Sequence, residues 1–447
     1  MITRGPDLLG TASAIQRHPR ADRAQLVAFQ DAKLRRLLAH AYEYVPYYRK
    51  LFDRHRLHPR HVRGVVDLDL IPITTKQDLR DLPPSETVAR GIDPSALLSV
   101  RTNGSTGEPF VVRRTRVEQG FHTLFRQRAY EAFGLGLRGR IAAISYPRPR
   151  HPKDTKLVGR WLSAMGVHPT LRVDGLQEPE AIVEQLEAFR PELISALPGM
   201  LVRVADHLIA TGQGRVRPRI VVVGGEVLTP LVRRRLTEAF GVAPLETYAS
   251  HEFQLLGWEC RTHGGIHTCD DGAIVEVLRQ GRPALPGEEG EVVATNLHAY
   301  AMPLIRYRLA DLVTRGADHC ACGQPFSVIG AIRGRMIDYF PLPNGRVIHP
   351  YQILQTIQPG ADVWIRQCQL LHDRPERIVL RVVPAGAPEP ELERRLRGAV
   401  LPLLGPGVEF LVRIVDDIPL DAGGKFRHAR SLMASTYEQA APPPAHG

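Results

Sequence analysis

The chain has 447 residues and a formal net charge of +11 at pH 7, from 58 Lys+Arg against 47 Asp+Glu. This length is enough for two domains with cores of their own, and the composition is that of a globular protein. The arginines are scattered, so the charge does not favour a nucleic-acid partner. The chain start lacks an apolar core of signal-peptide length, no apolar run approaches membrane-spanning length, and five cysteines do not indicate a disulfide framework. We therefore expect a cytoplasmic protein without a membrane partner.

The first two thirds of the chain predict an α/β fold. Residues 24–60 carry a helical pattern that Pro46 and Pro59 punctuate. From about 95 to 335, strand-like apolar runs alternate with helix-like stretches, which is typical of mixed sheets covered by helices. The predicted strands are Ile141–Ser145, Leu193–Ala196, Ile220–Val223, Ile274–Leu278 and Glu291–Thr295. The predicted helices cover about 117–133, 178–189, 199–211 and 229–239.

The pattern changes after about residue 336. Its elements are two alternating strands, an amphipathic helix and a third strand, at Trp364–Leu371, Arg377–Val383, Leu392–Leu404 and Val408–Val415. This β-β-α-β order predicts a separate small α+β domain. We divide the chain into an N-terminal domain at 1–334, a hinge at 335–338, a C-terminal domain at 339–439 and a disordered tail at 440–447.

Lysine is rare in this basic chain, which draws attention to Lys425. It follows the glycine pair Gly423-Gly424, and after Lys156 every other strong base is an arginine. A compact ammonium can enter a small polar site that a planar guanidinium cannot. Lys425 is therefore a candidate reactive or phosphate-facing group, and a surface lysine beside a turn is the plain alternative.

A second candidate site is the polar stretch between strand-like Leu97–Val100 and Phe110–Arg113. Glycines let backbone N–H groups approach phosphate oxygens, and hydroxyls add further donors. The candidate phosphate-binding residues are Thr102, Asn103, Gly104, Ser105, Thr106 and Gly107. A polar hairpin turn is the alternative. The stretch lacks the lysine of the common nucleotide loop.

A further glycine pattern, Gly134-Leu135-Gly136-Leu137-Arg138-Gly139, matches the dinucleotide fingerprint by letter only. That fingerprint needs a strand before it and a helix after it. Here a predicted helix precedes the glycines and the strand Ile141–Ser145 follows them. We predict a helix-to-strand turn.

Taken together and in order, these motifs resemble those of the adenylate-forming enzymes, and most of all the phenylacetate–CoA ligase branch. The stretch from Thr102 to Pro109 resembles the phosphate-binding loop, and Gly224-Gly225-Glu226 resembles the segment that lies against adenine. Tyr248-Ala249-Ser250-His251-Glu252 resembles the Y-G-x-x-E motif, in which the tyrosine stacks on adenine and the glutamate holds Mg²⁺.

The later motifs continue the resemblance. The segment 303–312 resembles the ribose-binding segment, whose aspartate is here Asp311. Gly334-Arg335-Met336-Ile337-Asp338 resembles the interdomain hinge, and Arg335 is expected to contact ribose or phosphate. Gly424-Lys425-Phe426-Arg427 resembles the catalytic-lysine motif. The sequence departs from the family pattern at four places: Glu108, Ala249, Leu309-Ala310 and Ile337.

The resemblance implies a two-step reaction. A carboxylic acid attacks the α-phosphate of ATP, with Glu252 holding Mg²⁺ and Lys425 between the two anions, and the acyl group then passes to coenzyme A. The resemblance favours an aromatic acid as the substrate. The residues expected to line its pocket are Phe121–Tyr130, Tyr146, Leu197–Met200 and Tyr248–Leu255. Transfer to a carrier protein or an amine stays open, as does a non-catalytic nucleotide-binding protein. A homodimer is common among such relatives.

Cysteine and histidine spacing predicts a structural zinc site. Cys260 and His267 form one cluster of soft ligands, and Cys320 and Cys322 form a second about fifty residues later. These four residues are the predicted ligands, with His263 as the alternative histidine. Reduced cytoplasmic thiols without a metal are the other interpretation.

Overall fold

The structure is a computed structural model of the whole chain. It describes residues 8–101, 110–145, 166–175, 177–212, 216–335, 340–343, 347–348, 350, 353–354, 356–357, 365–384, 390–419 and 427–432. The predicted phosphate loop at 102–107, Tyr146, the hinge residues 336–338, Lys425 and the tail at 440–447 lie outside these residues.

A helical layer opens the chain. Asp22 caps the long helix α2, because its carboxylate accepts a hydrogen bond from the Gln25 N–H at 2.7 Å. Pro46 then begins α3, since proline fits the first helical position and cannot continue the preceding helix. The helices are α1 (Leu8–Arg17), α2 (Arg23–Tyr44), α3 (Pro46–Arg54), α4 (Lys76–Arg80), α5 (Pro84–Thr87) and α6 (Arg116–Ala132).

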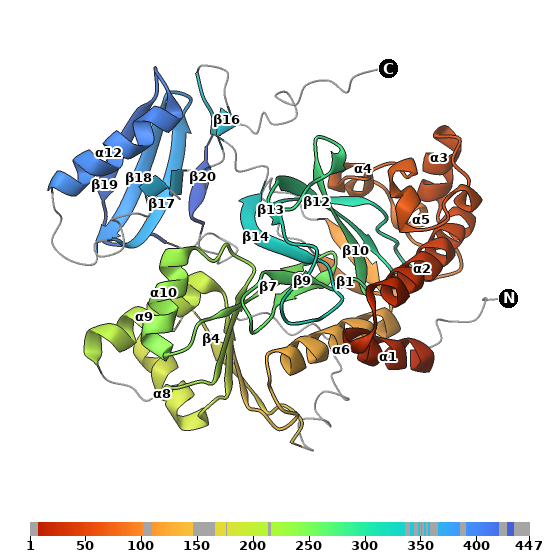
Figure 1. Ribbon diagram of the computed structural model, residues 1–447, viewed down its shortest axis with the longest axis horizontal. Coiled ribbons are helices and arrows are strands. Elements are labelled where there is room, and N and C mark those ends of the chain that lie inside the picture. The colour runs from red at the N-terminus through yellow and green to blue at the C-terminus, as the bar shows by residue number, and fades with distance from the viewer. Residues whose placement is uncertain are drawn as a thin grey trace.

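The main sheet has twelve strands among the described residues, in the order β11-β10-β12-β13-β14-β9-β8-β7-β6-β5-β3-β4. Its parallel half comprises β3 (Ile141–Ser145), β4 (Thr170–Asp174), β5 (Leu193–Ala196), β6 (Ile220–Gly224) and β7 (Leu245–Ser250). Its helices are α8 (Pro179–Phe189), α9 (Pro198–Thr211) and α10 (Pro230–Phe240), which lie together beside these strands in Figure 1.

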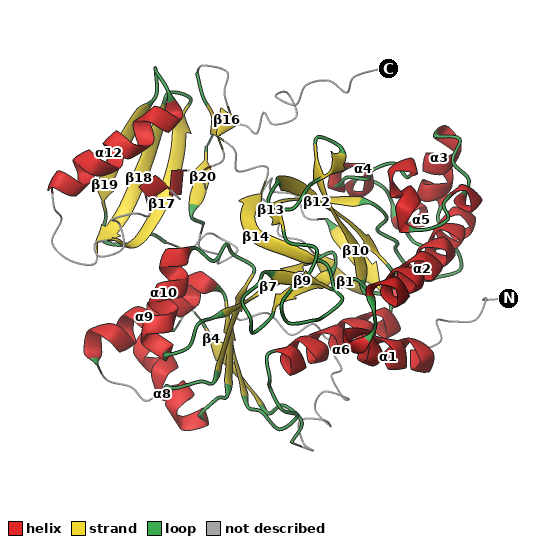
Figure 2. Cartoon of the chain, in the orientation of Figure 1, coloured by secondary structure: helices red, strands yellow, loops and turns green. Residues whose placement is uncertain are grey.

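Both faces of the parallel half are covered, as β6 shows. Val221 and Val223 pack into a core with residues of α8, α9 and α10. Ile220 and Val222 pack into a second core with Phe121 and others from α6, which Figure 2 shows on the far side of the strands. A strand buried on both faces needs a continuous apolar run, and this explains why the sequence signal for β6 is so plain.

The antiparallel half contains β8 (Gln254–Glu259), β9 (Ile266–Thr268), β10 (Ala273–Arg279), β11 (Arg282–Pro283), β12 (Glu289–Asn296), β13 (Tyr307–Arg315) and β14 (Val328–Arg335). Within its sheet order, three strands separate β7 from β13. Four steps at about 4.8 Å each would place them about 19 Å apart in a flat sheet. Yet the Tyr248 hydroxyl on β7 lies 2.7 Å from the Asp311 carboxylate on β13. This half of the sheet therefore curls so that its two sides face each other.

Apolar side chains fill the inside of the curl. Tyr248, Phe253 and Tyr307 belong to one buried cluster with residues of β8, β9, β13 and β14. Glycine permits the tight curvature at Gly257, where an added Cβ would lie 2.5 Å from the His267 carbonyl oxygen. Outside the curl, a buried ion pair fixes α6 to the sheet: Arg128 donates to both Asp271 oxygens, at 2.6 and 2.8 Å.

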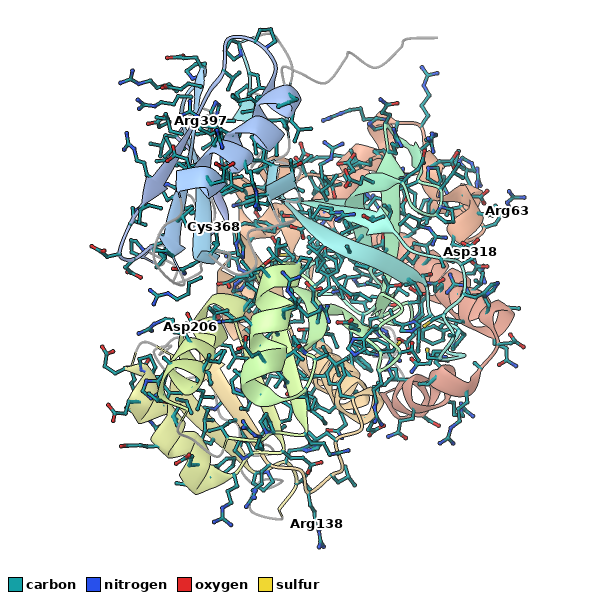
Figure 3. The ribbon with its side chains drawn as sticks, turned by 60° about the vertical axis from the view of Figure 1, so that its left-hand side comes forward. Arg63, Arg138, Asp206, Asp318, Cys368 and Arg397 are labelled. Atoms are coloured by element: carbon teal, nitrogen blue, oxygen red, sulfur yellow. The ribbon has the colours of Figure 1, made fainter. Side chains whose placement is uncertain are left out.

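The C-terminal part forms a smaller sheet in the order β19-β18-β17-β20. Its elements are β17 (Ile365–Arg374), β18 (Arg377–Pro384), α12 (Pro390–Leu404), β19 (Glu409–Ile414) and β20 (Ala429–Ser431), and a short pair β15 (Phe340–Pro341) and β16 (Val347–Ile348) precedes them. Arg366 of β17 lies 3.8 Å from Asp206 of α9. Figure 3 labels Asp206 below Cys368, another β17 residue, so this sheet sits over α9 and α10.

The predicted α/β class is confirmed. The nine predicted strands and helices of the first two thirds, and the four elements after residue 364, all appear within two or three residues of their predicted ends. The glycine fingerprint is indeed a turn between α6 and β3, with Gly134 at φ +85°. Sequence reasoning missed the helices α1 and α5 and the strands β4, β7, β8, β9, β11, β13, β14, β15, β16 and β20. The domain limits stay a prediction. No helix in the described part of the chain is long and apolar enough to cross a bilayer.

Candidate functional site

Tyr248 and Asp311 form the centre of the candidate nucleotide site. Tyr248 ends the parallel half of the sheet on β7, and its hydroxyl donates a hydrogen bond of 2.7 Å to Asp311 Oδ2. Both side chains are buried, at 4% and 9% exposed. The backbone of Arg335 on β14 lies opposite Asp311 in the strand register. The fold thus brings three of the predicted nucleotide-binding residues to one place.

Glu252 lies in the turn that follows β7. The turn is held by the Ser250 hydroxyl, which accepts a hydrogen bond from the Phe253 N–H at 3.0 Å. The Tyr307 hydroxyl lies 3.4 Å from Glu252 Oε1, close to the limit of a hydrogen bond. The charge of Arg114 also acts on this carboxylate through space. The Mg²⁺ role of Glu252 stays a prediction.

The segment Gly224-Gly225-Glu226 ends β6 beside these residues. A Cβ at Gly224 would lie 2.6 Å from the Thr247 carbonyl oxygen, and Gly225 has φ +82°, so both positions require glycine. The Glu226 carboxylate accepts a hydrogen bond of 2.8 Å from the Gly199 N–H at the start of α9. A negative charge there is stabilised by the helix dipole. The contact of this segment with adenine stays a prediction.

The described end of the catalytic-lysine motif docks beside this segment. His428, three residues after Lys425, hydrogen-bonds through its ring to the backbone of Val227. Burial lowers the pKa of His428 to about 4, so the ring is neutral at pH 7. The described segment 427–432 therefore reaches the end of β6, beside Gly224-Gly225-Glu226.

The predicted metal ligands come together. Cys260 follows β8, His267 lies on β9, and Cys320 and Cys322 lie in the connection between β13 and β14. All four ligand atoms lie within 4.8 Å of one another. Cys260 Sγ is 3.6 Å from Cys320 Sγ, and His267 Nε2 is 3.1 Å from Cys322 Sγ. A tetrahedral zinc with Zn–S bonds of about 2.3 Å would hold two sulfurs about 3.8 Å apart, so the donor set fits this ion.

The alternative histidine, His263, is outside this cluster. Its Nδ1 lies 2.8 Å from Glu259 Oε1, and the ligand group within 4.8 Å does not include it. The loop between Cys260 and His267 turns at Gly265, which has φ +116°. Gly265 approaches the Ile329 carbonyl oxygen so closely that an added Cβ would lie 2.7 Å from it.

Comparison with individual proteins of known function places the chain in a family, although no family model matches it. It is 30% identical over 338 residues to the phenylacetate–coenzyme A ligase of Thermus thermophilus, covering 74% of this chain and 75% of that protein. The chain belongs to the phenylacetate–coenzyme A ligase family. The enzyme of the same name from Escherichia coli is 29% identical over 305 residues, covering 64% and 67% of the two chains.

A solved structure supports the fold. A crystal structure of 2-hydroxyisobutyryl-CoA ligase, in the postadenylation state in complex with 2-HIB-AMP, superposes with a TM-score of 0.76 at 19% identity. The match covers 93% of this chain and 91% of that one. The family and the α/β class expected from the sequence are both confirmed.

Arg114 is a site residue that sequence reasoning missed. It ends β2 (Val111–Arg114), which pairs with β1 (Leu98–Arg101) on either side of the predicted phosphate loop. Its Nη2 donates to the carbonyl oxygens of His251 at 2.8 Å and Glu252 at 3.3 Å, and so supports the turn that carries Glu252. Period-2 alternation places Arg114 on the same face of β2 as Val112, but the burial of that face is known only from the structure.

The departure at Ala310 has a structural consequence. Ala310, beside Asp311 on β13, has φ +60°, a conformation that glycine adopts freely and alanine does not. The resemblance implies Thr-Gly where this chain has Leu309-Ala310, so Ala310 stands in place of a glycine. The backbone shape next to Asp311 is thus retained in this chain at a cost in stability.

We predict that Ala310→Gly stabilises the protein by roughly 0.5–1 kcal/mol, because relief of the left-handed strain exceeds the entropy that glycine loses. Chemical denaturation measures this. The control is Ala399→Gly at an exposed position in α12, where glycine should cost about 1 kcal/mol. An equal loss of unfolding free energy in Ala310→Gly and Ala399→Gly would show that Ala310 is not strained.

Proposed function

We propose that the chain activates a carboxylic acid with ATP, through an acyl-adenylate, and passes the acyl group to coenzyme A. The chain is an acid–coenzyme A ligase by family. The observation that carries the assignment of roles is the Tyr248–Asp311 hydrogen bond, which joins the expected adenine-stacking ring to the expected ribose-binding carboxylate.

The first step requires two anions to meet, so the chain's contribution is positioning and neutralisation of charge. Asp311 would accept hydrogen bonds from the ribose hydroxyls, and the buried Tyr248 ring would form one wall for adenine. Glu252 would hold Mg²⁺, which when bound neutralises phosphate charge. The residues 102–107 would hold the outgoing pyrophosphate, and Arg335 would contact ribose or phosphate.

Lys425 would supply the last positive charge, between the acid and the α-phosphate. The docking of His428 against Val227 supports this role, because it brings the neighbouring chain to the same strand end. A lysine on a separate domain can leave when its step is over, and the hinge at 335–338 would allow that movement. An aromatic acid is the substrate class that the family favours.

Acid-dependent exchange of pyrophosphate into ATP tests the first step, and thioester formation with free coenzyme A tests the second. We expect both with at least one acid from an aryl and aliphatic panel. Glu252→Gln should lower exchange by about 10²-fold, with partial recovery at high Mg²⁺. The control is Glu43→Gln at an exposed position of α2. Exchange without thioester formation would instead favour a carrier protein or an amine as the acceptor.

We also propose that Cys260, His267, Cys320 and Cys322 hold a structural zinc ion. The two pairs of ligands lie on neighbouring parts of the sheet, because β9 pairs with both β8 and β14 and His267 lies opposite Val328. The ion would join the segment 260–267 to the β13–β14 connection. This would stabilise the strand that carries Asp311.

Metal analysis of the purified protein tests the zinc site. We expect about one zinc per chain, little in Cys320→Ser or Cys322→Ser, and a lower unfolding midpoint in both variants. Cys368→Ser, on β17 far from the cluster, should keep the metal. Equal zinc in all four proteins would show that the ion binds elsewhere.

A further inference from the structure

An open cavity of about 230 Å³ lies at the opposite edge of the main sheet from the candidate nucleotide site. It is formed where β6 and β7 begin, whereas the predicted nucleotide residues lie where these strands end, roughly 15 Å further along them. The buried side chains around the cavity include Phe133, Ile220 and Leu245, and the exposed ones include Arg219, Arg261 and His263. The surface that a ligand can touch is therefore mainly basic.

Two guanidinium groups converge at this cavity. An atom added at the Cβ position of Gly134 would lie 3.3 Å from Arg261 Nη1 and 3.8 Å from Arg219 Nη1. The two nitrogens are therefore within about 7 Å of each other, near enough for their charges to repel. Gly134 follows α6 with φ +85°, and its lack of a side chain leaves room for both groups.

The acidic groups that contact the rim are paired with other cations. Glu192 accepts a hydrogen bond of 3.0 Å from Arg219 Nε, and Glu259 accepts one of 3.1 Å from Arg233 Nη2. In the part of the chain that the structure describes, Arg261 makes no hydrogen bond or ion pair, and Arg219 donates only through Nε and Nη2. One positive charge and the N–H groups of two Nη1 atoms are thus left for a partner from outside the chain.

A phosphate group suits these donors better than a carboxylate does. A carboxylate pairs best with one guanidinium that lies in its plane. A tetrahedral phosphate directs its oxygens to several sides and can bridge two guanidinium groups, and its double negative charge offsets their repulsion. The cavity has room for it, since 230 Å³ is several times the roughly 30 Å³ that one water occupies.

We propose that Arg219 and Arg261 form a binding site for a phosphate group, separate from the candidate nucleotide site. The bound anion ties the segment 260–267, which carries two of the predicted metal ligands, to the end of α6. The phosphate is free or belongs to a larger molecule, which can extend into solvent because the cavity is open. This site does not depend on the proposed function, and its test uses no turnover.

Thermal unfolding of the intact protein in orthophosphate, against chloride of equal ionic strength, tests the site. We expect about 20 mM orthophosphate to raise the unfolding midpoint of the parent by at least about 2 °C more than that of Arg261→Met. Phosphate bound at the nucleotide site would stabilise both proteins equally, so this difference reports the cavity. Arg413→Met, at an exposed position of β19, should respond as the parent does.

Arg261→Lys keeps the charge without the planar fork, and we expect it to retain part of the response. Pyrophosphate and adenosine 3′,5′-bisphosphate, tested in parallel, distinguish the sources of the phosphate. A larger rise with the nucleotide than with orthophosphate, lost in Arg261→Met, assigns the site to a phosphorylated nucleotide. An equal response of the parent and Arg261→Met to all three anions overturns the proposal.

Tungstate, a heavy tetrahedral dianion like phosphate, shows the position directly when soaked into crystals of the parent. We expect an anomalous difference peak between Arg219 and Arg261. Tungstate bound only at other places would contradict the site.

Discussion

The curl of the antiparallel half of the sheet is the constraint on which the candidate site depends. Sheet order alone separates β7 from β13 by three strands, yet their side chains meet at 2.7 Å between Tyr248 and Asp311. Without that curvature Tyr248 and Asp311, the residues expected to contact adenine and ribose, would lie on distant strands. The parallel half ends at β7, so the curl begins where the parallel order stops, and the loops that carry ligand residues gather at this edge.

Several separate features maintain the curl. Glycine allows close backbone approach at Gly257, and the interior is packed by the cluster that contains Phe253 and Tyr307. The four predicted metal ligands lie together, within 4.8 Å of one another, and a zinc ion there would join two segments of the sheet. Arg114 joins the phosphate-loop hairpin to the Glu252 turn. The small C-terminal sheet docks against the end of β6 through His428 and the Val227 backbone. Our proposal places the charge of Lys425 near this contact.

The features that could be predicted from the sequence are those that depend on a short stretch of residues. The runs at Leu193–Ala196 and Ile220–Val223 were found because strands covered on both faces are continuously apolar. The cluster of predicted metal ligands was found because the chain has only five cysteines and the spacing of Cys260, His267, Cys320 and Cys322 is distinctive. Most of the nucleotide residues came from resemblance to a family. Their contacts could not be predicted, since Tyr248 and Asp311 meet only through the curl.

Other features depend on context that a sequence does not state. Ala310 gives no sign of its positive φ, because alanine rarely adopts it. β20 is too short to show a period, and its pairing with β17 is long-range. Arg114 looked like one more arginine in an arginine-rich chain, and only burial on the inner face of β2 distinguishes it. The choice between His263 and His267 as ligand likewise needed the fold.

The central claim is that a lysine from the C-terminal domain serves only the joining of two anions, on a site assembled by the curled sheet. The most direct test measures both half-reactions of Lys425→Ala. We expect the rate of adenylate formation, measured by acid-dependent pyrophosphate exchange, to fall by about 10²-fold or more. The rate of thioester formation from supplied acyl-adenylate and coenzyme A should stay near that of the parent. Equal rates in parent and variant for adenylate formation, or equal loss in both half-reactions, would contradict the account.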